Sequence, residues 1–269
     1  MKKTDGQPVT IVADNLSVGW ARAILELSKP GVTRIAPMTL IIRGFEGNGA
    51  ADEVPEIRAG VDEFLTRQDK RDVENVAWTI FPQRYLDLAA GDRESFFDLF
   101  NDTFPRIQSF NPRNNNRGSY FQRLVNLGGE DGGFNQLRWI LEQYENHPNS
   151  RRVSKFQATT FDPIRDYSSA GQLEFPCLQQ VSFTFEGDAL HMNAFYATQQ
   201  LARKGYGNYL GLARLGAFMA TEMKLTFAQL NVFVGVAKMD VKKSDPDLMA
   251  LLSIIKRHAD SARAILIPA

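Results

Sequence analysis

A stretch of alternating apolar and polar residues late in the chain places the strongest constraint on the fold. The alternation runs on both sides of Glu186-Gly187-Asp188, a triplet typical of tight turns. The apolar positions are Val181, Phe183, Phe185, Leu190, Met192 and Ala194. Strands with one buried face alternate in this way, so the sequence predicts a β-hairpin over Gln179–Thr198.

Helical and strand-like patterns surround this hairpin in no regular order. Apolar residues at helical spacing predict helices over Ser17–Lys29, Val54–Leu65, Ser95–Phe104, Asn135–Glu145 and Asn208–Met223, and a last one from Asp245-Pro246. Short apolar runs predict strands at Val9–Val12, Met38–Arg43 and Leu230–Ala237, with a loop at Gly44–Asp52. Pro105 is expected to end the third helix, because proline has no N–H to donate. Without a regular βαβ alternation, the α+β class is favoured, in a single domain over residues 1–269.

Composition excludes several functional classes. Lys plus Arg number 31 and Asp plus Glu number 31, so the neutral chain has no overall attraction to nucleic acid or to an anionic membrane. We expect no transmembrane helix and, without an apolar leader, a cytoplasmic protein. One cysteine and three scattered histidines allow no disulfide within the chain and predict no metal site. The common phosphate-loop, dinucleotide and nucleophile-elbow motifs are absent from the sequence.

Two local patterns carry candidate chemistry. Arg151 and Arg152 follow His147-Pro148-Asn149-Ser150, and adjacent guanidinium groups can bind a phosphate or a carboxylate. Cys177 follows Pro176 directly before the hairpin, and a thiolate near such arginines is favoured as a nucleophile. Taken alone, each has an ordinary alternative, because free cysteines are mostly small buried apolar residues and arginine pairs are mostly solvated.

The order of these patterns resembles the thymidylate synthase family. That family has a helix, an Asn-Pro-x-Ser-Arg-Arg segment, a strand and a Pro-Cys before its central strands, which WILEQYENHPNSRRVSKFQATTFDP and FPCLQQVSFTFEGDALHMNAFY match here. Gly118–Leu124, which contains Tyr120, is similar to the family's Gly-x-Tyr-Gly segment. Gly207-Asn208-Tyr209 falls where the family has its Phe-Asn segment. The resemblance covers residues 118–240, and residues 1–117 are divergent.

The resemblance implies a fold, a reaction and a cofactor. The fold would be a mixed sheet with flanking helices, in a homodimer that joins through the sheet and shares its active sites. Cys177 would attack C6 of a pyrimidine nucleotide, and C5 would accept a one-carbon unit from 5,10-methylenetetrahydrofolate.

The resemblance also assigns substrate-binding roles. Arg151 and Arg152 would hold the partner subunit's nucleotide phosphate, and Tyr120 would belong to the substrate site. Asn208 would read the base edge, because an amide both donates and accepts, and this favours uracil. Alternatively, Asn208 is the N-cap of its helix.

Several family features are missing from the sequence. The phosphate-binding Tyr-x-Arg-Ser-x-Asp becomes Phe195–Gln200, which has no arginine, although Thr198 could replace the serine. The Gly-Asp-x-His-x-Tyr segment that holds the sugar has no match in Phe233–Asp240. The family's proton-shuttling glutamate falls on Gly60, with Glu56 and Glu63 nearby. A retained nucleophile with altered sugar and proton-transfer groups is what a change of substrate would produce.

The sequence therefore supports three hypotheses. The first is a divergent C5 transferase that adds a methyl or hydroxymethyl group to a uridine- or cytidine-type monophosphate. The second is a catalytically inactive nucleotide-binding or regulatory homodimer of the same fold. The third is an unrelated α+β interaction protein. The apolar Ala264–Ala269 end resembles the family's closing tail, but edge-strand or core packing is the simpler interpretation.

Overall fold

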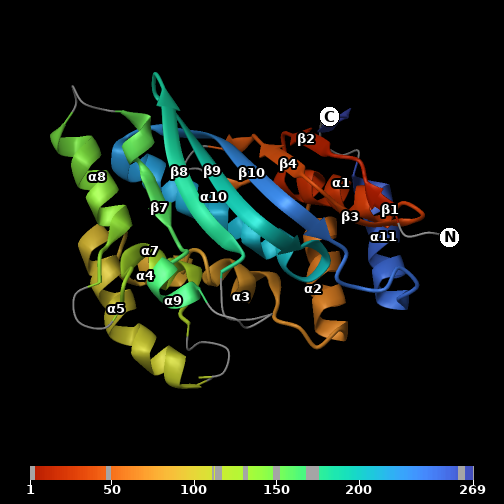
Figure 1. Ribbon diagram of the computed structural model, residues 1–269, viewed down its shortest axis with the longest axis horizontal. Coiled ribbons are helices and arrows are strands. Elements are labelled where there is room, and N and C mark those ends of the chain that lie inside the picture. The colour runs from red at the N-terminus through yellow and green to blue at the C-terminus, as the bar shows by residue number, and fades with distance from the viewer. Residues whose placement is uncertain are drawn as a thin grey trace.

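The computed structural model describes residues 4–46, 50–110, 112, 117–129, 133–147, 152–167, 176–259 and 264–268. Within them, nine strands form one mixed sheet with helices beside it, so the α+β class is confirmed (Figure 1). The sheet strands are β1 (Thr4–Gly6), β2 (Val9–Ala13), β3 (Val32–Ile35), β4 (Met38–Ile42), β7 (Gln157–Thr159), β8 (Leu178–Glu186), β9 (Ala189–Gln200), β10 (Thr226–Lys238) and β11 (Ala264–Pro268).

The helices follow the predicted order along the chain. They are α1 (Leu16–Ser28), α2 (Pro55–Arg67), α3 (Val73–Trp78), α4 (Gln83–Leu88), α5 (Arg93–Phe110), α7 (Tyr120–Val125), α8 (Gln136–Asn146), α9 (Pro163–Asp166), α10 (Tyr206–Met223) and α11 (Pro246–His258). The 3-10 helix η1 covers Val153–Lys155, and the π-helix η2 covers Leu201–Gly205 and leads directly into α10. Asn135 and Asp245 cap α8 and α11 with their side chains, as short polar residues at helix starts do.

The strand order is β11-β2-β4-β10-β9-β8-β7, with β1 and β3 attached beside β10. The predicted hairpin is confirmed, because β8 and β9 pair antiparallel around the Glu186-Gly187-Asp188 turn. β9 and β10 pair in parallel, with η2 and α10 as the crossover between them. This crossover brings Cys177, the ends of β9 and β10, and the start of α10 to one end of the sheet.

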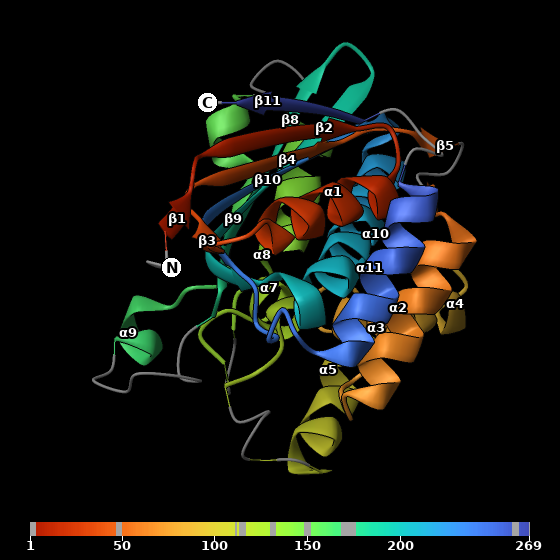
Figure 2. The same cartoon turned by 90° about the vertical axis from the view of Figure 1, so that its right-hand side faces the viewer.

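One face of the sheet is covered and the other is open. α10 lies behind β8, β9 and β10 in Figure 1, and Figure 2 shows α10 and α1 on the same side of the sheet. α10 is buried on most of its sides, which agrees with its apolar sequence. No helix in the described residues lies over the opposite face in either view.

Three local predictions are wrong and one is confirmed. The expected Gly44–Asp52 loop contains a strand pair, β5 (Phe45–Glu46) and β6 (Ala50–Ala51). α5 runs through Pro105, because one missing donor in an exposed helix costs only one hydrogen bond while Phe100 and Phe104 still pack inward. Asn208 is not an N-cap, because η2 already precedes α10. The C-terminal residues form the edge strand β11.

Candidate active site around Cys177

Cys177 is held at the first position before β8. Its carbonyl oxygen accepts a hydrogen bond from the backbone N–H of Ala197 at 3.1 Å, which ties the residue to β9. The thiol is free and half-buried. Burial raises the pKa of the Cys177 thiol, whereas the nearby positive charges of Lys238 and Lys204 act to lower it. These two lysines are therefore the groups that favour the thiolate.

Tyr120 lies directly against this segment. The backbone N–H groups of Leu178 and Cys177 donate to its hydroxyl oxygen, and burial raises the pKa of the hydroxyl well above its usual range. Tyr120 is the first residue of α7, whose N-cap Ser119 accepts from the N–H of Gln122 at 3.1 Å. The structure thus brings together Tyr120 and Cys177, which the sequence resemblance had assigned to one site.

The positive charges of two lysines on other elements act on the thiol. Lys238 ends β10, opposite Gln200 of β9, and Lys204 lies on η2. Desolvation lowers the pKa of Lys204, and repulsion from Arg71 lowers it further. Lys204 therefore has charge interactions with both Arg71 and Cys177. We call Lys204, Lys238 and Arg71 the basic cluster.

Buried polar atoms without partners gather at the same end of the sheet. At this end, four buried side-chain atoms have no hydrogen-bond partner among the described residues. They are Tyr196 Oη, Gln199 Nε2, Arg203 Nε and Asp240 Oδ2. Tyr196 is fully buried opposite Leu178, and Gln199 is 2% exposed. Burying such atoms unpaired costs about 1–3 kcal/mol each. Several unpaired polar atoms at one end of the sheet are the arrangement expected of a site that a polar ligand completes.

Asn208 lies one helical turn after Lys204. It occupies the first turn of α10 and is 5% exposed, and its amide finds no hydrogen-bond partner among the described residues. Positions four apart share a helix face, so the Asn208 side chain lies on the Lys204 side of the helix. Its position is compatible with the predicted base-reading role, which stays a prediction.

The other predicted residues are less closely associated with the thiol. Arg151 lies outside the described residues. Arg152 is exposed at the start of η1, and no described contact joins it to Cys177. Thr198 donates its hydroxyl to the carbonyl of Val236 at 3.2 Å within the sheet. Their phosphate-binding roles stay predictions.

The carboxylates nearest the family's glutamate position do not meet Cys177. Glu56 and Glu63 are exposed on α2, and Glu63 pairs with Arg67 at 2.5 Å. Gly60 faces α11, where an added Cβ would lie 3.0 Å from Ile254. The charge of Lys204 interacts with both the Asp240 carboxylate and the Cys177 thiol. Sequence reasoning missed Asp240, because no local motif marks where β10 ends beside η2.

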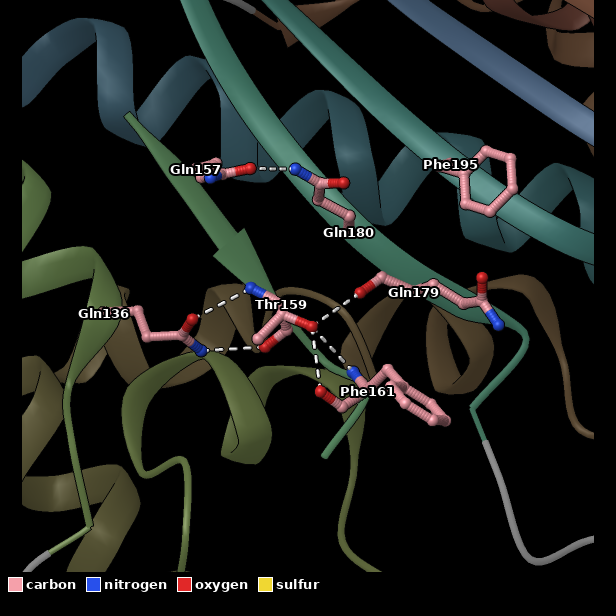
Figure 3. A pocket seen from close by; sticks show the side chains of 7 residues that line it. All are labelled: Gln136, Gln157, Thr159, Phe161, Gln179, Gln180 and Phe195. Carbon is pink, nitrogen blue, oxygen red and sulfur yellow. Dashed lines mark hydrogen bonds between the residues drawn. The ribbon is translucent and has the colours of Figure 1, made fainter. Parts of the chain in front are cut away.

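The open sheet face carries a separate depression of about 550 Å³. Figure 3 shows that its polar groups bond to one another. The Gln136 side chain donates to the Thr159 carbonyl and accepts from the Thr159 N–H, both at 2.8 Å, and Gln180 donates to Gln157. Because these amides are already paired, they present few unsatisfied groups to a ligand.

The middle of the same face carries mostly neutral side chains. The outward residues of β7 to β10 that we call the outer face are Gln157, Thr159, Gln180, Ser182, Thr184, His191, Asn193, Phe195, Asn231 and Phe233. Phe195 and Phe233 stack at 5.6 Å between ring centroids and are 37% and 41% exposed. Asn231 donates to Asn193 at 2.9 Å beside them. An aromatic centre depleted of charge is typical of the core of a protein interface.

Comparisons with known proteins find a distant relative whose name agrees with the resemblance. No protein-family model matches the chain. A protein of Methanocaldococcus jannaschii named "Putative thymidylate synthase" is 29% identical over 106 residues, which cover 39% of this chain and 46% of that protein. The chain thus matches less than half of that relative's length, and the likeness supports a distant thymidylate synthase-like relationship.

Two general properties of the described residues complete the description. None of their helices combines the length and apolar character needed to cross a bilayer. No three of their His, Cys, Asp and Glu side chains gather where they could share a metal ion.

Proposed function

We propose that this protein is a divergent thymidylate synthase-like transferase that adds a one-carbon unit to C5 of a pyrimidine nucleoside monophosphate. One observation carries the proposal: the half-buried Cys177 thiol interacts with the charges of two lysines, at the end of the sheet where unpaired buried polar atoms also lie. The partial likeness to a thymidylate synthase-named protein supports the same reaction class.

The thiol would act as a covalent catalyst. Its sulfur bonds to C6 of the pyrimidine ring, and the electron pair of the C5–C6 double bond moves towards C5 and the O4 carbonyl. C5 would then bond to the electrophilic one-carbon unit, and loss of the C5 proton would expel tetrahydrofolate and form a C5 methylene. That methylene would take a hydride from the tetrahydrofolate, which gives a methyl group and dihydrofolate, or water, which gives a hydroxymethyl group, as the sulfur leaves and the C5–C6 double bond re-forms. The Tyr120 hydroxyl lies beside Cys177 and is the group we assign to proton transfer at the ring.

The basic cluster would hold the phosphate. The arginine of the family's Tyr-x-Arg-Ser pattern is missing, and Lys204, Lys238 and Arg71 supply positive charge at the same end of the sheet. Lysine binds phosphate as a compact point charge. In this assignment the lysines both attract the nucleotide and favour the thiolate. Asn208, on the Lys204 side of α10, would read the base edge.

The residues around α3 and α4 fit a folate. A groove of about 810 Å³ is lined by Trp78, Tyr85 and Phe110 together with Arg71, Arg84 and other residues. Its aromatic side chains would pack against a pterin ring, and its arginines would pair with carboxylates. Arg71 also interacts with Lys204, which connects the groove to the Cys177 site. When bound, 5,10-methylenetetrahydrofolate supplies the one-carbon unit.

The outer face would join two copies of the chain. Its stacked Phe195 and Phe233 would form the centre of a homodimer interface, surrounded by amide and hydroxyl groups. Arg152 is exposed and could then reach the partner subunit's nucleotide together with Arg151.

The test is release of tritium from [5-³H]-labelled UMP, dUMP, CMP and dCMP, each with and without methylenetetrahydrofolate. We expect release from one of them, which Cys177→Ala abolishes and the matched control Ser182→Ala on β8 retains. Exchange that survives in Cys177→Ala would refute the nucleophile, and absence of release from all four would refute the transferase.

A non-catalytic nucleotide-binding role is the second candidate. The observation that favours it is that burial raises the pKa of the Cys177 thiol, while no described carboxylate contacts that thiol. Calorimetric binding of a nucleotide without tritium release would support this role. Binding of none of the four nucleotides would exclude both candidates.

A further inference from the structure

We infer that the Cys177 site takes a ribonucleotide in preference to a deoxyribonucleotide, with Asp240 accepting a hydrogen bond from a ribose hydroxyl. The inference rests on the proposed function and names the sugar of its substrate. It follows from the position of Asp240, from the unpaired atoms around it and from the charges on either side.

Asp240 is fixed at the junction between β10 and η2. Its Oδ1 accepts the backbone N–H of Ala202 at 3.0 Å. The residue lies two positions after Lys238 and has a charge interaction with Lys204, and both lysines also act on the Cys177 thiol. The carboxylate therefore belongs to the same end of the sheet as the thiol.

The unpaired atoms define what a ligand must offer there. Asp240 Oδ2 is a buried acceptor without a partner among the described residues, so the ligand must present a donor. A phosphate oxygen cannot meet this need, because it is an acceptor and carries the same charge. Gln199 Nε2 and Arg203 Nε are unpaired donors on neighbouring elements, so the ligand should also present acceptors.

A ribose hydroxyl meets both needs, since one hydroxyl donates and accepts at once. A ribose offers two adjacent hydroxyls and a deoxyribose offers one, so a ribose would leave fewer of these three buried atoms unpaired than a deoxyribose would. The charges around the site would also orient the nucleotide. The phosphate would face the basic cluster, and the sugar would lie towards Asp240.

The ionisation of Asp240 agrees with this arrangement. Burial raises the pKa of the Asp240 carboxyl, whereas backbone N–H donors and the Arg203 charge act to lower it. Burying a charged carboxylate oxygen without a hydrogen-bond donor costs free energy, and a hydroxyl donor would stabilise the charged form.

The experiment measures binding of UMP, dUMP, CMP and dCMP by titration calorimetry to the full chain. We expect the wild type to bind one ribonucleotide roughly 10-fold or more tightly than its deoxy form, the effect of one hydrogen bond to a charged group. In Asp240→Asn the ratio should fall to about 3-fold or less. Asp188→Asn, in the exposed hairpin turn, should keep the wild-type ratio.

Outcomes for the sugar and for the proposed function can be told apart. Equal or tighter binding of the deoxynucleotide, with Cys177-dependent tritium release intact, would overturn the ribose inference alone. Binding of no nucleotide would overturn the proposed function as well. The wild-type ratio needs no variant, so poor folding of Asp240→Asn would leave the inference tested. If Asp240→Asn folds and the ratio is unchanged, Asp240 pairs within the protein, for example with Arg203, and does not read the sugar.

Discussion

Replacing Asp166 by Asn should destabilise the protein through a buried ion pair behind the candidate site. Arg123 and Asp166 are 4% and 0% exposed, and the guanidinium donates to both carboxylate oxygens, at 2.6 and 2.9 Å. Asp166 also accepts the backbone N–H of Asp162 at 2.8 Å, and Arg123 donates to the Thr160 carbonyl at 2.7 Å. The pair thereby joins α7, which carries Tyr120, to the segment that follows β7.

The expected magnitude follows from this geometry. Asp166→Asn keeps the shape but leaves the Arg123 charge buried without its counter-ion, a change that typically costs about 3–5 kcal/mol. The free energy of unfolding is measured by urea denaturation at pH 7, where the midpoint should fall without a change in slope. Glu63→Gln removes an exposed pair with Arg67, in which both side chains are more than half exposed, and should cost less than about 1 kcal/mol.

The pH dependence gives a second measurement. Burial acts to raise the pKa of Asp166, but the hydrogen bonds from Arg123 and the Asp162 N–H outweigh it, so the pKa is lowered. A carboxyl with a lowered pKa in the folded state stabilises the protein above its unfolded value of about 3.9, and this contribution is lost as the pH falls through the folded value. Asp166→Asn should therefore flatten the acid limb of the stability curve. A loss below about 1 kcal/mol at pH 7 would refute the reasoning, because it would mean that water reaches the pair.

Three further predictions concern the site and the outer face. Lys204→Met should raise the pKa of the Cys177 thiol and slow its alkylation by iodoacetamide at pH 8 by roughly 2- to 5-fold. The control Lys256→Met on α11 should not change the rate, and an unchanged rate in Lys204→Met would show that Lys204 does not act on the thiol. Phe195→Lys should weaken self-association about 10-fold or more in analytical ultracentrifugation, whereas Met249→Lys at an exposed position of α11 should not. A monomeric wild type would contradict the outer-face interface. Trp78→Ala should weaken methylenetetrahydrofolate binding about 10-fold, measured by fluorescence titration, without affecting nucleotide binding. Equal folate affinity of the variant and the wild type would show that the groove is not the folate site.

The elements that the sequence predicts well are those with a local physical cause. The hairpin follows from a period of two around a turn triplet, and α8 follows from apolar residues at helical spacing after the Asn135 cap. The errors arise where a local signal competes with packing. Pro105 is a helix breaker in isolation, yet Phe100 and Phe104 just before it are held in the core and the helix continues.

The candidate site could be predicted only in part, for a different reason. Cys177, Tyr120 and Asn208 stand in segments whose order resembles a known family, so the sequence offers a pattern for them. Lys204 and Asp240 have no such pattern. They meet because β10 lies parallel to β9 in a register that places Lys238 opposite Gln200, and because η2 follows β9 without a loop. A register between distant strands is a property of the packed sheet and is not written in either segment alone.

In the proposed function the site would hold a phosphate without the family's arginine. A guanidinium placed on β9 would supply charge and direction together. In the proposed site Lys238 on β10 and Lys204 on η2, together with Arg71, would supply the charge, and two ammonium groups lack the fixed two-pronged geometry of a guanidinium. Direction must then come from the neutral and acidic groups around the sugar and the base. The proposal would therefore assign more of the substrate specificity to Asn208, Gln199 and Asp240 than to the phosphate contacts. The sugar, rather than the phosphate, would then be the part of the ligand that distinguishes this site.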